Sequence, residues 1–195
     1  GGIQTAAVPK PSASKPAPAN GQGDLFSMAD IPVDTIEGQY KTIKDTPHEY
    51  RVADDEKSLN ELLDELRNAG NFCFDTETTS LDPMAARIVG MSFSVTPGSA
   101  AYLPLKHDYF DAPAQLDFSE TLAKVKPILE NAAIKKVGQN LKYDQHVLAN
   151  HGIELNGIAH DTLLQSYVFE SHKTHGMDAL SERHLGIKTI TFEEV

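Results

Sequence analysis

The sequence predicts an α/β fold in which a mixed sheet, made of an antiparallel meander plus parallel strands, is flanked by helices. Three strand-like segments follow one another between residues 71 and 105, a pattern typical of an antiparallel meander. From residue 119 onward, helical and strand-like patterns alternate, as they do in α/β domains. A length of 195 residues, with 40% hydrophobic and 23% charged residues, fits one domain and a tail.

The first two predicted elements are a strand and a helix. Residues 49–53, EYRVA, predict a short strand. A helix is expected next, opened by a capping box from Ser58 to Glu61 and ended by Gly70, with the acidic residues 54–56 at its favourable end. The leucines that recur at helical spacing are Leu59, Leu62, Leu63 and Leu66.

The meander is predicted from three successive segments. Residues 71–77, NFCFDTE, form the first strand, and residues 87–95 and 100–105 form the next two around the turn TPGS. In the middle strand, alternate apolar side chains share one face, namely Val89, Met91, Phe93 and Val95.

The second half of the chain predicts helices on either side of a strand. A helix beginning at residue 119 contains Pro127, which strains it. Residues 133–138 predict a strand and residues 141–151 a helix. The apolar positions of the first of these helices are Leu122, Val125 and Leu129.

Two further helices complete the domain. Asp161 is expected to be the N-cap of a helix whose apolar residues include Leu163, Leu164, Tyr167 and Val168. The segment MDALSERHLG predicts a last helix that ends at Gly186.

The N-terminal segment has a different composition. Residues 1–23 consist mainly of Pro, Ala, Ser and Gly with two lysines, and residues 24–47 show no apolar period. We therefore expect residues 1–48 to be a disordered or surface linker and residues 49–195 to form the domain.

Charge and cysteine content restrict the class of protein. A net charge of −11 argues against a protein that mainly wraps nucleic acid, although a site that acts through divalent cations is compatible with it. The single cysteine, Cys73, has no disulfide partner, which favours a reducing compartment and a cytoplasmic location. No segment has the length and apolarity expected of a membrane span or a secretory signal, so no membrane partner is expected.

Two carboxylates on one strand suggest a metal site. Asp75 and Glu77 lie two residues apart in a predicted strand, so their side chains point the same way about 7 Å apart. Like charges this close repel unless a cation lies between them. Asp144, four residues after Asn140 at the start of a helix, is a candidate third ligand because helix starts beside strand ends carry the chemistry of α/β sheets.

The same residues carry a resemblance to a known family. The segments DTET with SLD, VGQNLKYD, GIELNGIAHDTLLQSYVF and LGIKTITFEE resemble the 3'-to-5' proofreading exonuclease domain of bacterial DNA polymerase I, a family A polymerase. This domain is a member of the DEDD exonucleases. The resemblance covers about residues 49–195, and the acidic pair together with the Asn-x-x-Tyr-Asp spacing makes it specific.

The resemblance implies a ribonuclease H-like fold and removal of mismatched nucleotides from a DNA 3' end, in DNA replication and repair. It implies hydrolysis with two divalent ions, magnesium or manganese with zinc as an alternative, held by Asp75, Glu77 and Asp144. The implied partners are a single-stranded or frayed DNA 3' end, the nucleoside monophosphate product and a polymerase domain of the parent chain. The implied substrate contacts are Leu81 as a wedge, Phe192 as a stacking residue, and Gln139, Asn140 and Tyr143 along the single-strand channel.

One part of the family pattern is missing from these residues. The third motif, Tyr-x-x-x-Asp, would follow TFEE, and after the second motif no Tyr is followed four residues later by Asp or Glu. We therefore expect the sequence to be a piece of a longer polymerase that lacks the C-terminal part of the exonuclease domain. A chain of this length is expected to bind metal weakly and to hydrolyse DNA slowly or not at all.

Plainer interpretations remain open for several residues. Asp75 and Glu77 could be an exposed strand face, Asn140 could be a helix N-cap, and Tyr143 could serve packing. The alternative function is a non-catalytic scaffold that supports an adjacent polymerase domain. Retention of the acids in both motifs favours the enzyme, and an RNA-trimming nuclease or small-nucleotide phosphatase on the same fold would share the metals.

Overall fold

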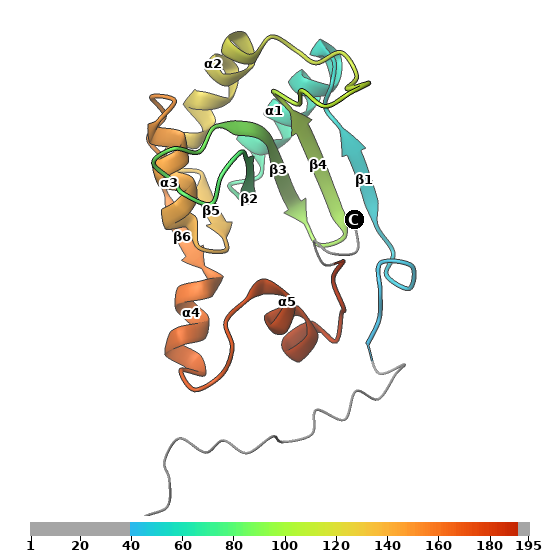
Figure 1. Cartoon of the computed structure of the whole chain (residues 1–195), viewed down its shortest axis with the longest axis vertical. Coiled ribbons are helices and arrows are strands. Elements are labelled where there is room, and N and C mark those ends of the chain that lie inside the picture. The colour runs from blue at the N-terminus through green and yellow to red at the C-terminus, as the bar shows by residue number, and fades with distance from the viewer. Residues whose placement is uncertain (1–39, 191–195) are drawn as a thin grey trace, which may run out of the picture. The chain divides into compact units, whose positions relative to one another are not determined.

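The computed structural model describes residues 40–190, and these contain a six-stranded mixed sheet with helices packed against it (Figure 1). The strand order is β1-β4-β3-β2-β5-β6. The strands are β1 (Glu49–Val52), β2 (Asn71–Thr78), β3 (Ile88–Thr96), β4 (Ser99–Pro104), β5 (Lys135–Gly138) and β6 (Ile158–Asp161). The predicted mixed sheet is thus confirmed.

The sheet combines a meander with parallel strands, as the sequence predicts. β2, β3 and β4 pair antiparallel in succession, while β1 pairs with β4 and β5 pairs with both β2 and β6 in parallel. The helices are α1 (Glu56–Asn68), α2 (Phe118–Leu129), α3 (Leu141–Ala149), α4 (Thr162–Phe169) and α5 (Met177–Leu180), followed by the π-helical turn η1 (Ser181–Leu185).

Strand β2 separates a buried face of the sheet from an open one. Its side chains alternate strictly, so that Phe72, Phe74 and Thr76 are buried while the residues between them are exposed. The buried face packs against the leucines of α1 and against apolar residues of α2 and α3 in one core. The face that carries Asp75 and Glu77 is therefore the open one.

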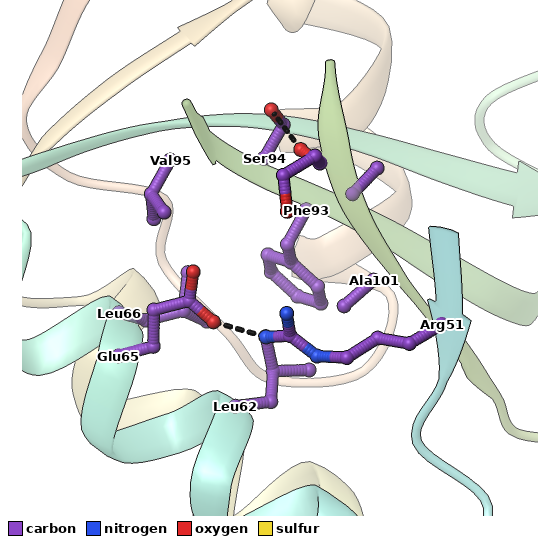
Figure 2. A pocket seen from close by; sticks show the side chains of 10 residues that line it. Arg51, Leu62, Glu65, Leu66, Phe93, Ser94, Val95 and Ala101 are labelled. Carbon is purple, nitrogen blue, oxygen red and sulfur yellow. Dashed lines mark hydrogen bonds and ion pairs between the residues drawn. The ribbon is translucent and has the colours of Figure 1, made fainter. Parts of the chain in front are cut away.

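Helix α1 is capped locally at its start, and an ion pair near its end links it to strand β1. Its N-cap is Asp55, which forms a capping box with Ser58, so the box predicted from Ser58 to Glu61 is wrong in register by one turn. Asp55 is the cap because its backbone is in the β region directly before the first helical turn. From there its side chain accepts a hydrogen bond from the N–H of Ser58, which has no partner within the helix. Figure 2 shows Arg51 of β1 reaching Glu65 of α1 as an ion pair.

In the second half of the described chain, strand β6 is not predicted from the sequence, whereas the predicted helix that contains Pro127 is present. Strand β6 was not expected, and it exists because it pairs with β5, with Gly138 opposite Asp161. Pro127 lies inside α2 near its C-terminus without ending the helix. The last predicted helix is present as α5 and η1, and it ends at Gly186, whose φ of 65° suits a glycine.

Residues before the predicted domain boundary also contact the domain. Lys41 forms an isolated parallel bridge with Ile187, and its N–H donates to the carbonyl of Gly186 at 2.8 Å. Most of residues 40–48 are exposed. The linker and domain boundaries stay predictions, because residues 1–39 lie outside the described range. Between residues 40 and 190, no helix has the length and apolarity needed to cross a membrane.

Candidate active site

The open face of β2 presents the predicted acidic pair. Asp75 and Glu77 are both exposed, and in the antiparallel register they lie opposite Ser92 and Gly90 of β3. Partial burial of the carboxyl group and the charge of Glu77 raise the pKa of Asp75 above its ordinary value. The charge of Glu77 thus acts on Asp75, as expected if the two acids lie as close together as strand alternation predicts.

The first turn of α3 brings Asp144 to the same segment of β2. The side chain of Asp144 is only 2% exposed, and its Oδ1 accepts hydrogen bonds from the backbone N–H of Thr76 at 3.1 Å and from the Thr76 hydroxyl at 2.6 Å. Burial, with the charge of Asp75 as a smaller cause, raises the pKa of Asp144 to about 6, against the hydrogen bonds from Thr76. Asp144 is therefore bonded to the residue that lies between the two acids of the pair.

The three carboxylates are neighbours, but they do not form a closed cage. Among residues 40–190, no group of three or more His, Cys, Asp or Glu side chains is arranged so that it could hold a metal ion. Two acids lie on the open face, and the third is bonded to a buried side chain. The chemistry of the donor set fits a hard divalent cation, because all of its possible ligand atoms are carboxylate oxygens.

Tyr143 connects α3 to the loop that follows β2. Its hydroxyl lies in hydrogen-bond contact with the Thr78 hydroxyl and donates to the carbonyl of Ser80. The next residue in this loop, Leu81, is 96% exposed. Tyr143 thus has a structural task of tethering the loop, and the loop presents an apolar side chain to solvent as a wedge would require.

Gln139 borders a hollow beside the acidic pair. A cavity of about 350 Å³ is lined by Asp75, Ser92, Gln139 and Met177, among others. The Gln139 amide donates to the carbonyl of His175 at 3.0 Å and also contacts the hydroxyl of Thr162. Gln139 and Asp75 therefore face one hollow on the open side of the sheet.

Asn140 lies at the N-cap position of α3, but its side chain makes no capping hydrogen bond within residues 40–190. Its φ of 61° and ψ of 42° place it in the left-handed region, which asparagine tolerates better than most residues. Asn140 thus occupies the N-cap position that the plainer interpretation gives it, but in the described part of the chain its side chain does not cap the helix. Asp161 accepts the backbone N–H groups of Asn140 and Leu141 instead.

Tyr102 and His107 are neighbours of the site that the sequence reasoning missed. The Tyr102 hydroxyl is 2.6 Å from Nε2 of His107, and burial together with the charge of Glu77 raises the pKa of Tyr102 to about 12. A Cβ at Gly90 would meet the Tyr102 hydroxyl at 1.9 Å, so the glycine makes room for the ring. A glycine inside a strand was the available signal. Phe192, the predicted stacking residue, lies outside the described residues.

The sequence of the chain also matches known proteins. The family model described as 3'-5' exonuclease matches residues 50–195. DNA polymerase I of Pseudomonas aeruginosa is 45% identical over 161 residues, which cover 81% of this chain and 18% of that protein. The chain thus spans less than a fifth of this curated relative.

Solved structures share the fold. NrnC of Brucella melitensis with bound Mg²⁺ matches with a TM-score of 0.53 and 21% identity, covering 73% of this chain and 64% of that chain. RNase D of Trypanosoma brucei matches with a TM-score of 0.55 and 18% identity, covering 70% of this chain and 47% of that chain. The fold is therefore the ribonuclease H-like fold of these exonucleases.

Proposed function

Because this chain belongs to the 3'-5' exonuclease family of DNA polymerase I, we propose that it removes nucleotides one at a time from a single-stranded or frayed DNA 3' end and releases nucleoside monophosphates. The task would be proofreading during replication and repair, next to a polymerase domain of the parent protein in the bacterial cytoplasm. Residues 49–195 would form the nuclease domain and residues 1–48 a linker.

We propose that Asp75, Glu77 and Asp144 hold two divalent ions, magnesium or manganese. When bound, these ions supply an activated water and stabilise the departing 3' oxygen. Asp75 would contribute to both ions, because its charge interacts with that of Glu77 and with that of Asp144. Glu77 would bind on the open side and Asp144 on the side of α3.

The positions of several residues support the substrate contacts that we propose. Leu81 is exposed at the end of a tethered loop, where it could wedge against a terminal base. Gln139 borders the hollow beside Asp75, and Asn140 and Tyr143 follow it in the chain, so the three would line the path of the strand. Phe192 remains a proposed stacking residue. An unpaired 3' end would be preferred, because no free energy is then needed to separate its bases from a complementary strand.

The observation that carries this proposal is the placement of Asp144 directly against Thr76, between the two acids of β2. A scaffold without catalytic function has no need of a buried carboxylate whose pKa is raised by its surroundings. The enzyme therefore remains the first proposal and the scaffold its alternative.

The activity can be measured directly. We expect excess chain with Mn²⁺ to shorten a 5'-labelled single-stranded oligonucleotide slowly from its 3' end, because three of the four family carboxylates are present in these 195 residues. Asp75→Ala should abolish the shortening, whereas Asp54→Ala, at an exposed acid between β1 and α1, should leave it unchanged. The sequence alone allows slow hydrolysis or none, and the proposed activity requires the slow hydrolysis. Shortening that survives Asp75→Ala, or none at all in the parent, would therefore contradict the proposed activity. Rapid multiple-turnover digestion would contradict only the expected slowness.

A further inference from the structure

The carboxylate of Asp161 accepts backbone hydrogen bonds from two helices at once. Its Oδ1 accepts from the N–H groups of Leu163 at 3.0 Å and Leu164 at 3.3 Å in α4, and also from Asn140 at 3.0 Å. Its Oδ2 accepts from the N–H of Leu141 at 2.9 Å. The cap of α4 was expected from the sequence, whereas the bonds to the start of α3 were not.

Helix α3 depends on these two bonds for its first turn. The first N–H groups of a helix have no partner within it. Asn140 does not supply one from its side chain, and its left-handed backbone begins the helix directly beside the end of β6, where Asp161 pairs with Gly138. The start of α3 is thus fixed by a residue twenty positions further along the chain.

This connection reaches the candidate active site. Asp144 lies three residues after Leu141, in the first turn of α3, and its Oδ1 must meet the N–H and hydroxyl of Thr76 on β2. A displacement of about 1 Å at a catalytic group can cost on the order of 100-fold in rate. The position of α3 therefore determines how well Asp144 is placed against β2.

We infer that Asp161 is a positioning residue for Asp144, acting through the start of α3. The inference builds on the proposed function in that Asp144 is taken as a catalytic carboxylate. It assigns to Asp161 no contact with substrate or metal. Its role is to keep the first turn of α3 at the end of β5 and β6 so that Asp144 stays bonded to Thr76.

The Thr76 amide is a direct reporter of this role, since its N–H donates to Asp144. In Asp161→Asn, we expect the amide oxygen to take the place of Oδ1, because Oδ1 accepts from three N–H groups. The NH₂ group then takes the place of Oδ2 and cannot accept from the N–H of Leu141. We expect the Thr76 amide to exchange with deuterium about tenfold faster or more, because exchange reports local opening. Mn²⁺-dependent shortening of the oligonucleotide should slow in parallel.

The matched control is Asp117→Asn. Asp117 caps α2 by accepting from the N–H of Glu120 at 2.9 Å. The variant Asp117→Asn therefore makes the same chemical change at the cap of a helix outside the site. It should alter neither Thr76 exchange nor hydrolysis. If Asp161→Asn does not fold, Asp161→Ser replaces it, because a shorter hydroxyl can cap α4 but cannot reach α3.

The possible results separate the inference from the proposed function. Unchanged Thr76 exchange in a folded Asp161 variant, equal acceleration in Asp117→Asn, or undiminished hydrolysis despite faster exchange would overturn the positioning role. If the parent chain shortens no DNA, the proposed function fails, and Thr76 exchange still decides whether Asp161 holds Asp144 in place.

Discussion

Among single residues, Asp144 has a carboxyl group whose charged form is disfavoured by burial. Burial favours its protonated form and raises its pKa to about 6, while the ordinary value is 3.8. The folded chain therefore keeps this proton at pH 5, where the unfolded chain has lost it. The stability that this group contributes is present below about pH 4 and is lost as the pH rises through 6.

Replacing Asp144 by asparagine should therefore stabilise the metal-free chain at neutral pH. Asp144→Asn keeps an oxygen acceptor for Thr76 and removes the buried charge, so the free energy of unfolding at pH 7 should rise by on the order of 3 kcal/mol. The gain should shrink towards zero at pH 4. Urea unfolding in EDTA at both pH values measures this. Equal stability of variant and parent at pH 7, or a gain of the same size at pH 4, would contradict it.

Single residues also mark where sequence reasoning stopped. Asp75 and Glu77 were predictable because strand alternation alone fixes their common face. The role of Asp161 at α3 was not, because its bonds to Asn140 and Leu141 join residues about twenty positions apart and depend on the pairing of β5 with β6. The N-cap interpretation of Asn140, one of those that the sequence leaves open, is correct for its position. Its left-handed backbone has no local signal in the sequence.

At the scale of the element, the connection between α2 and β5 is held by a buried lysine. Lys136 is fully buried, and its Nζ donates to the carbonyls of Ile128 at 2.8 Å, Asn131 at 2.8 Å and Ile134 at 3.0 Å. The ammonium also lies 5.7 Å from the ring centroid of Phe72. This one side chain satisfies carbonyls at the end of α2 and in the turn that leads into β5.

Removing this ammonium should destabilise the domain. Lys136→Met leaves buried carbonyls without a donor, so we expect the free energy of unfolding to fall by about 2 kcal/mol or more. The neighbouring Lys135→Met is the control, because Lys135 is exposed and its ammonium donates to the exposed carbonyl of Ala132. This variant should cost about 0.5 kcal/mol. Thermal or urea unfolding of the two variants compares them. Equal losses would show that Lys136 does not hold this connection.

Elements were predictable where their pattern is local and long. The leucines of α1 and the alternation of β2 and β3 indicate their elements without reference to the rest of the chain. β6 was missed because four residues with an exposed pattern become a strand only through a parallel partner. The start of α1 was placed one turn late because Ser58 and Asp55 both resemble caps, and only the backbone angles distinguish them.

At the scale of the whole described domain, the mixed sheet determines where the acids lie. The change from meander to alternating helices and strands predicted the architecture, but the pairing of β1 with β4 is a non-local parallel contact that the sequence pattern could not indicate. The helices of the core cover one face of β2, so Asp75 and Glu77 face the open side and Asp144 reaches their strand from α3. This arrangement is the basis of the proposed cation site.

Binding of Mn²⁺ tests that site most directly, and it does not depend on the rate of hydrolysis. Titration of the 195-residue chain at pH 7, followed by the electron paramagnetic resonance of free Mn²⁺, should show saturable binding. The binding should weaken at least about tenfold in Asp75→Ala, since the charge of Asp75 interacts with those of both other acids. Asp54→Ala, which removes the same charge elsewhere, should bind as the parent does. Absence of saturable binding, or equal affinity in the parent and Asp75→Ala, would contradict a cation site shared by Asp75, Glu77 and Asp144.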